Sequence, residues 1–171
     1  MIFEKFVILA GVLMVHIING SSLFDFGPEI KPDFMILFVL FFALRKGEMS
    51  GLWIGFLGGL LSDAGLGGEE GLGGKIYYKI GIHSLSFSFV GYLLGKFGRT
   101  FYNENYLSIT IYAFVITLMM RSFTYFLFSF FFYTNLNYSL VICSIYNAAI
   151  APLSFFVFSW VYKLQPAEVI R

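Results

Sequence analysis

Charged residues and cysteine are both scarce in this sequence, and each shortage excludes a class of protein. Charged residues make up only 12% of the 171 positions, about half the share of an ordinary soluble domain. The net charge of +1 leaves no basic face that could neutralise nucleic-acid phosphates, so nucleic-acid binding is excluded. Cys143 is the single cysteine, which excludes a disulfide framework and a multi-cysteine metal site.

Apolar residues, by contrast, are abundant. Hydrophobic residues account for 58% of the chain, the mean hydropathy is +0.81, and there are 23 phenylalanines and 11 tyrosines. On a water-soluble protein of this size they would form large exposed apolar patches, so we interpret the chain as a membrane protein. The segment 1–24 has one lysine and a long apolar run without a small-residue cleavage site. We therefore expect a retained span and not a removable signal peptide.

Six apolar runs are candidates for transmembrane helices, each of which needs about 20 residues to cross a bilayer. The second run is short, so we expect its polar ends to snorkel or the bilayer to thin locally. A re-entrant hairpin over 34–62 is disfavoured because it would bury Arg45 and Lys46 in hydrocarbon. No internal repeat or long linker is visible. The sequence therefore predicts an all-α polytopic protein with residues 1–171 in one domain and spans at 6–24, 34–44, 50–66, 76–97, 106–133 and 138–164.

The distribution of cations predicts the orientation of these spans. With Lys79 and Arg121 set aside as lying inside spans, the cations gather on one side of the predicted membrane. Because cytoplasmic loops carry an excess of lysine and arginine, we expect both termini in the cytoplasm. The seven cations on that side are Lys5, Arg45, Lys46, Lys96, Arg99, Lys163 and Arg171, against Lys31 and Lys75 on the other.

Glycines recur every four residues in the third span and in the turn before it. Gly47, Gly51, Gly55 and Gly59 line one helix face, and the fourth span offers a second strip of small residues in Ser84, Ser88, Gly91 and Gly95. Small residues let helix backbones approach closely, which drives helix association in membranes. We favour packing of the third span against the fourth, with a face for another protein as the alternative.

Three charged residues stand out near or within the predicted spans. Asp63 lies toward the outer end of the third span, and Arg121 lies near the middle of the fifth. Because an unpaired charge in a membrane is costly, we expect these two to share one intramembrane polar site. Asp33 and helix-end carbonyls are other candidate partners for Arg121, and contact with water is the alternative for Asp63. Asp33 itself precedes an apolar run, as an N-cap residue does.

Reactive groups are not arranged for catalysis. His16, Asn19 and His83 could be ligands or proton carriers, but no second histidine or acid lies at metal-ligand spacing. The stretch GGEEGLGGK at 67–75 lacks the glycine and the hydroxyl residue of a phosphate-binding loop, so we expect a flexible outer loop. Neither a GxSxG motif nor a cysteine with a basic partner is present. We expect no enzyme activity, no cofactor and no metal.

One segment resembles a known family. The strings PDFMILFVLFFALRKGEMSGLWIGFLGGLLSDAGLG, at 32–67, and SFVGYLLGKF, at 88–97, resemble the rod shape-determining protein MreD family of bacterial inner membranes. The Gly-Gly-Glu-Glu-Gly loop at 67–71 departs from the pattern. The family pattern maps onto Pro32, Asp33, Gly47, Gly51, Gly55, Phe56, Gly59, Leu60, Asp63, Gly91, Tyr92 and Gly95.

The resemblance implies a function that composition does not show. It implies a non-enzymatic scaffold of the cell-elongation machinery that binds MreC, in contact with membrane lipids. Such a scaffold helps couple the MreB cytoskeleton to the peptidoglycan glycosyltransferase RodA and its penicillin-binding transpeptidase partner. It also implies similarity to the six-helix substrate-binding subunits of energy-coupling factor vitamin transporters. A small-molecule-binding subunit of that kind is the alternative function, although Met14 stands where such subunits carry the second alanine of an Ala-x-x-x-Ala motif that begins here at Ala10.

Overall fold

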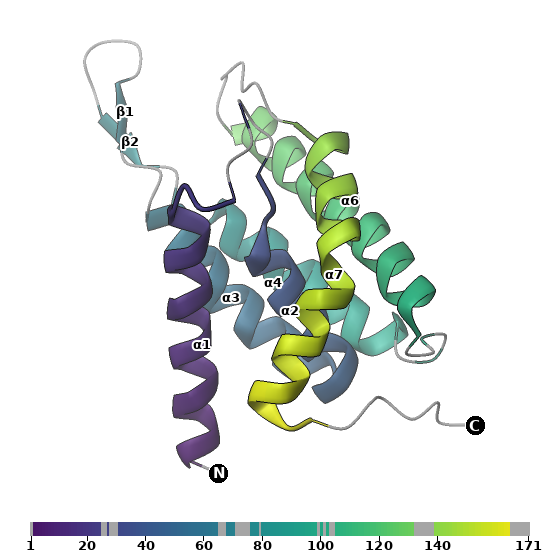
Figure 1. The fold of residues 1–171 in the computed structure, drawn as a ribbon. Coiled ribbons are helices and arrows are strands. Elements are labelled where there is room, and N and C mark those ends of the chain that lie inside the picture. The colour runs from purple at the N-terminus through teal and green to yellow at the C-terminus, as the bar shows by residue number, and fades with distance from the viewer. Residues whose placement is uncertain are drawn as a thin grey trace.

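The computed structural model describes residues 2–24, 27, 31–64, 68–70, 76–78, 80–98, 100, 102, 105–131 and 139–164. Within them the fold is a bundle of six helices with one short hairpin (Figure 1). The helices are α1 (Ile2–Gly20), α2 (Phe34–Lys46), α3 (Glu48–Ala64), α4 (Ile82–Leu93), α6 (Tyr106–Phe131) and α7 (Val141–Tyr162), and a π-helical turn, η1 (Leu94–Gly98), extends α4. The strands β1 (Gly68–Glu70) and β2 (Ile76–Tyr78) pair antiparallel, with Glu69 opposite Tyr77.

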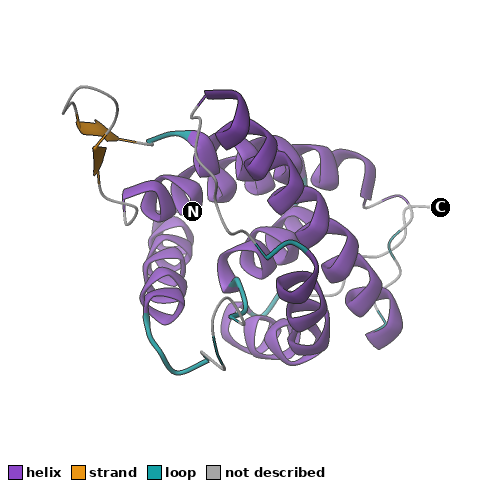
Figure 2. Ribbon diagram, turned by 90° about the horizontal axis from the view of Figure 1, so that it is seen from above, coloured by secondary structure: helices purple, strands orange, loops and turns teal. Residues whose placement is uncertain are grey.

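Successive helices run in opposite directions, so the bundle has two distinct ends. The start of α1 and the end of α7 lie at one end, and the β1–β2 hairpin projects from the other (Figure 1). Seen from above, the hairpin stands to one side of the helices and covers none of them (Figure 2). The all-helical class expected from the sequence is confirmed for the bundle, and the hairpin is an addition to it.

The short helix α2 lies in the centre of the bundle. It contacts α1, α3, α4, η1, α6 and α7, and every residue from Met35 to Leu44 is at most 1% exposed. Helix α2 is apolar on all faces, as expected of a helix that is buried on every side. Its aromatic rings pack against α7, for example Phe41 on Phe155 with ring centroids 5.3 Å apart.

Central burial changes the interpretation of the second span. At about 20 Å, α2 is shorter than the roughly 30 Å of bilayer hydrocarbon, and the sequence suggested snorkelling ends or a thinned bilayer. A helix that is surrounded by protein does not need to match the bilayer. The backbone groups at its ends need partners inside the protein instead.

Helices α3 and α4 meet along a seam of small residues. A Cβ on Gly51 would lie 2.3 Å from the carbonyl oxygen of Gly91, and one on Gly59 would lie 2.4 Å from Cα of Ser84. Distances this short leave no room for any side chain. The glycines of α3 therefore permit direct contact between two backbones within the same chain.

The start of the fourth helix differs from the prediction. The sequence suggested a helix from residue 76, whereas residues 76–78 form β2 and α4 begins at Ile82. Gly81 lies between them with φ of 104°, a left-handed conformation that glycine adopts without strain. The chain turns at this glycine, and the helix starts directly after it.

The outer surfaces of the bundle are apolar. Exposed side chains on four different helices include Phe6 at 65%, Trp53 at 60%, Phe130 at 71% and Phe156 at 69% exposure. By length and composition, α6 and α7 are the two helices in the described part of the chain that could clearly cross a membrane.

We predict that a side chain at Gly55 or Gly59 will separate α3 from α4. A Cβ at Gly55 would lie 2.4 Å from the carbonyl oxygen of Phe87, so Gly55→Leu and Gly59→Leu should each lower stability by at least about 1 kcal/mol. Thermal unfolding in detergent measures this loss. Gly20→Leu is the matched control, because nothing lies within 4 Å of its Cβ position. Wild-type stability in both seam variants would show that the seam is not close-packed.

Candidate functional site

The beginning of α2 is held by Asp33 and by Asn19 of α1. Oδ1 of Asp33 accepts hydrogen bonds from the backbone N–H groups of Met35 at 3.1 Å and Ile36 at 3.3 Å, so Asp33 caps the helix. The amide of Asn19 donates to the same oxygen at 3.0 Å, and its own oxygen accepts from the N–H of Phe34 at 2.9 Å. The free amide hydrogens at this helix start are therefore satisfied by two side chains.

A buried asparagine completes this cluster from the other side. Oδ1 of Asn147, in α7, accepts from the backbone N–H of Asp33 at 2.8 Å, and its amide nitrogen donates to the Asp33 carbonyl at 3.2 Å. The same amide donates to the hydroxyl of Thr117, in α6, at 3.0 Å. Asn147 and Thr117 are fully buried. Asp33, Asn19, Asn147 and Thr117 thus join α1, α2, α6 and α7, and we call them the α2 cap cluster.

Sequence reasoning did not single out Asn147 or Thr117. A lone asparagine in the apolar run VICSIYNAAIAPL is the one available signal, since a buried amide in a membrane helix requires partners. Its partner Asp33 lies 114 residues earlier in the chain, so no local pattern could identify the pair.

Asp63 binds the start of α4 much as Asp33 binds the start of α2. Its carboxylate accepts from the backbone N–H groups of Gly81 at 2.8 Å, His83 at 3.0 Å and Ser84 at 3.2 Å, and Nδ1 of His83 lies 2.9 Å from Oδ1. The position of Asp63 at the end of α3 opposes the dipole of that helix. It is instead placed against the positive start of α4, where a carboxylate is favourable.

The expected pairing of Asp63 with Arg121 needs correction. Asp63 is 2% exposed, and the donors around it come from Gly81, His83 and Ser84. Arg121 donates from Nε to the carbonyl of Ser139 at 2.9 Å, just before α7 begins. The amide groups at the start of α4 therefore bind the carboxylate of Asp63. The guanidinium of Arg121 instead donates to the backbone carbonyl of Ser139.

The structure also shows what surrounds His83 and the six glycines expected to form a helix-packing face. His83 packs edge-on against Phe87 and Phe128, with centroid distances of 5.7 and 5.5 Å. Gly47, Gly51, Gly55, Gly59, Gly91 and Gly95 all lie along the α3–α4 seam or at its end, where a Cβ on Gly95 would lie 2.5 Å from Cα of Glu48. Among the described residues no three metal-ligating side chains come together.

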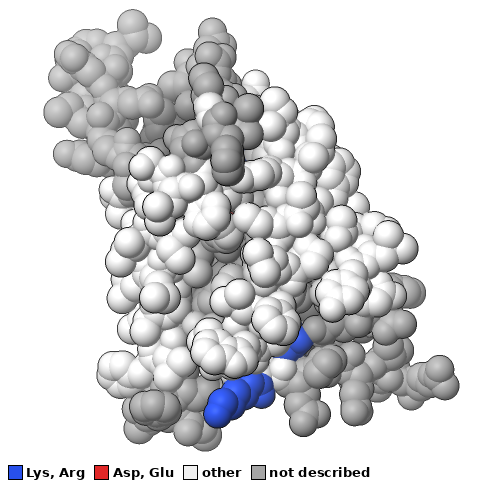
Figure 3. Space-filling view, viewed as in Figure 1, with Lys and Arg blue, Asp and Glu red and all other residues white. Residues whose placement is uncertain are grey.

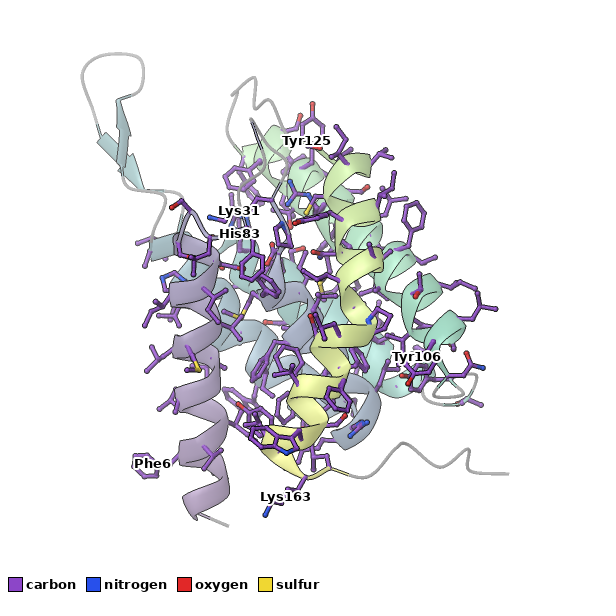
Figure 4. All side chains as sticks on the ribbon, in the orientation of Figure 1. Phe6, Lys31, His83, Tyr106, Tyr125 and Lys163 are labelled. Carbon is purple, nitrogen blue, oxygen red and sulfur yellow. The ribbon has the colours of Figure 1, made fainter. Side chains whose placement is uncertain are left out.

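The end of the bundle away from the β1–β2 hairpin is cationic. Figure 4 shows Lys31 and His83 toward the hairpin end and Lys163 at the other. On the face drawn in Figure 3, the visible lysine and arginine atoms all lie at the end where α7 finishes. The guanidinium of Arg45 stacks over Phe41 at 4.7 Å and donates from Nη1 to the carbonyl of Leu164. Arg45 thus ties the end of α2 to the end of α7.

We predict that Asp63 is energetically coupled to His83 and not to Arg121. In double-mutant cycles, Asp63→Asn with His83→Gln should show a coupling of about 0.5–3 kcal/mol, since these residues share a hydrogen bond. Asp63→Asn with Arg121→Gln should be additive within about 0.5 kcal/mol. Unfolding of the purified protein in detergent provides both measurements. Coupling to Arg121 that equals or exceeds coupling to His83 would contradict the arrangement.

Comparison with known families gives one match. The sequence profile described as rod shape-determining protein MreD matches residues 2–165. No curated protein and no solved structure matches the chain. The matched region includes the segment 32–97 on which the resemblance rests and extends over the first and last helices. The chain therefore belongs to the rod shape-determining protein MreD family.

Proposed function

We propose that this chain is a non-enzymatic scaffold of the cell-elongation machinery in the bacterial inner membrane. In this proposal it binds MreC and helps couple the MreB cytoskeleton to RodA and its penicillin-binding transpeptidase partner. Family membership supports a role in rod-shape determination and a place in the membrane. The observation that carries the finer proposal is that Asp33, Asp63 and Asn147 bind helix ends, while the outer surfaces are apolar. Such a molecule offers apolar surfaces for docking, and the polar side chains named here serve the fold.

The proposal includes six membrane crossings. Besides α6 and α7, α1 is about 28 Å long and α3 about 26 Å, close to the roughly 30 Å of hydrocarbon. Helix α4 is continued by η1, which adds five residues. Helix α2 is shorter, but it is covered by its neighbours. The alternating directions in Figure 1 then bring the start of α1 and the end of α7 to one side, and the cations there favour the cytoplasm.

A reporter fusion tests this topology. Alkaline phosphatase fused after residue 164 should be inactive, because that enzyme requires the periplasm, and green fluorescent protein at the same site should fluoresce. The matched control inserts the same reporters at 71–75, between β1 and β2, where the opposite pattern is expected. Equal phosphatase activity at both sites would contradict the prediction that the two sites lie on opposite sides of the membrane.

Partner binding must use surfaces other than the α3–α4 seam. Gly51, Gly55 and Gly59 are in direct contact with the backbone of α4, so this face is closed within the chain. The outward faces of the helices, including those of α3 and α4, and the two ends of the bundle remain. If another protein binds a face of this bundle, that face is therefore one of these surfaces and not the glycine face of α3.

A vitamin-transporter subunit would need a polar cavity near its outer mouth, for which Asp63, His83 and Arg121 are the obvious candidate lining residues in the sequence. In the described part of the chain they do not converge: Asp63 and His83 pair at the start of α4, and Arg121 bonds to Ser139. We therefore do not extend the proposal to transport, and the similarity to the fold of those subunits stays a prediction.

Affinity purification distinguishes the two functions. The tagged full chain, extracted in mild detergent, should recover MreC together with RodA and its transpeptidase partner. An unrelated six-span membrane protein with the same tag and expression level is the control. Thermal unfolding first verifies that the purified protein is folded. Recovery of transporter ATPase subunits without MreC would then contradict the scaffold proposal and favour the alternative.

A further inference from the structure

An apolar groove of about 340 Å³ lies between α6 on one side and α4 with its extension η1 on the other. The residues of its floor are buried, with Val90 1%, Leu94 5% and Ile116 8% exposed. Each wall carries one exposed side chain, since Phe97 of η1 is 58% and Met119 of α6 is 44% exposed. The groove is therefore open to the outside of the bundle.

Helices α4 and α6 touch at both ends of the groove. Toward the hairpin, the hydroxyl of Ser86 donates to the carbonyl of Met120 at 3.1 Å. Toward the other end of the bundle, the hydroxyl of Tyr112 donates to the carbonyl of Gly98 at 3.4 Å. Between these two hydrogen bonds each wall is about two helical turns, or about 10 Å, long. The groove therefore runs along the two helices, which is also the direction of a lipid acyl chain beside a membrane-spanning helix.

A cation lies beside the exposed wall residue of η1. The ammonium group of Lys96 is 5.6 Å from the ring centroid of Phe97, which lines the groove, and 5.7 Å from that of Tyr92. Aromatic rings attract a cation but carry no formal charge. Among the described residues Lys96 forms no ion pair, and this includes Glu48, whose backbone packs against Gly95. The two rings therefore position the ammonium group, and its charge is available to an anion.

The direction of α4 gives the depth of this cation in the proposed membrane placement. Helix α4 runs away from the hairpin (Figure 1), so η1 lies toward the end of the bundle at which α7 finishes. Under the proposed topology that end faces the inner leaflet, whose surface carries anionic lipids. The groove then extends from the level of Lys96 toward the middle of the bundle, as an acyl chain extends from its headgroup.

We propose that this groove holds an acyl chain of an anionic phospholipid whose phosphate contacts the ammonium group of Lys96. A soluble anion would make no use of the apolar lining, and a zwitterionic lipid would bring its own cation toward Lys96. Two turns of a partner helix with its side chains occupy roughly 800 Å³, so such a helix could lie over the groove but not fill it. Binding of this lipid requires the proposed orientation in the membrane but not the binding of MreC, so either can fail alone.

Native mass spectrometry of the full chain in detergent tests the site. Titration with phosphatidylglycerol should give a saturable first lipid that binds more tightly than phosphatidylcholine with the same acyl chains. Lys96→Gln should weaken the binding of phosphatidylglycerol about fivefold, since it removes one cation near the phosphate, and should not change the binding of phosphatidylcholine. Met119→Trp, which narrows the groove, should weaken the binding of both lipids. Because Lys96 is exposed, its replacement leaves the bundle intact and decides the result if Met119→Trp is unstable.

Two matched controls make the same changes elsewhere. Lys163→Gln removes an exposed lysine at the same end of the bundle, and Met14→Trp enlarges a methionine of α1 that is 66% exposed. Neither residue lines the groove, so both variants should bind phosphatidylglycerol as the wild type does.

Four results would overturn the site or its ligand. Equal affinity for the two lipids, or equal weakening by Lys163→Gln, would indicate nonspecific attraction. Unchanged lipid binding in Met119→Trp would remove the acyl chain from the groove. Displacement of the lipid by glycerol 1-phosphate at similar concentration would indicate a soluble anion. A dimer that Met119→Trp dissociates, with lipid binding intact, would instead assign the groove to a second copy of the chain.

Discussion

A helix that is covered on every side by apolar neighbours must find partners for its terminal backbone groups within the protein, because neither water nor lipid can supply them. Helix α2 is subject to this constraint. Its first amide groups are satisfied by Asp33 and Asn19, and the backbone of Asp33 by Asn147. An apolar residue at 147 would leave the N–H of Asp33 without its partner, which costs about 1–3 kcal/mol for a buried group, whereas the Asp33 carbonyl would keep its bond from the N–H of Leu37. The cap cluster therefore fixes the central helix along its axis and also fixes α1, α6 and α7 around it.

The same chemistry places α4. Asp63 receives the amide groups at the start of that helix, and three glycines of α3 allow the two backbones to touch along the seam. The carboxylate determines how far along α3 the next helix begins, and the glycines determine how close it lies. A shift by one residue along the seam would break the hydrogen bonds to Asp63. Local capping and long-range packing thus select one arrangement of the α3–α4 pair.

Features with a local cause could be predicted from the sequence, and features with a distant partner could not. The four-residue spacing of glycines indicates a close helix contact, and an aspartate before an apolar run indicates a cap.

The partner of Asp63 depended on where α4 starts, which was expected at residue 76 but lies at Ile82. The β-branched Ile76 and the aromatic Tyr77 and Tyr78 suit a strand as well as a helix, and a single sequence does not show which one the turn at Gly81 selects. Asn147 was missed because its meaning comes from Asp33, 114 residues away. Arg121 was expected to share a site with Asp63, with helix-end carbonyls as an alternative, and its Nε donates to the carbonyl of Ser139.

The two ends of the bundle have different chemistry, and this difference bears on how a scaffold can work. At the hairpin end, Asp33 and Asp63 are engaged with helix starts, so their negative charges serve the fold and are not available to attract a ligand. At the other end, Lys163 and the partly buried Lys46 line an open pocket. The caps of α2 and α4 both lie at the hairpin end, so under the proposed topology they are separate from the cytoplasmic end. In the proposed scaffold function, partners on opposite sides of the membrane would therefore meet ends of different chemistry.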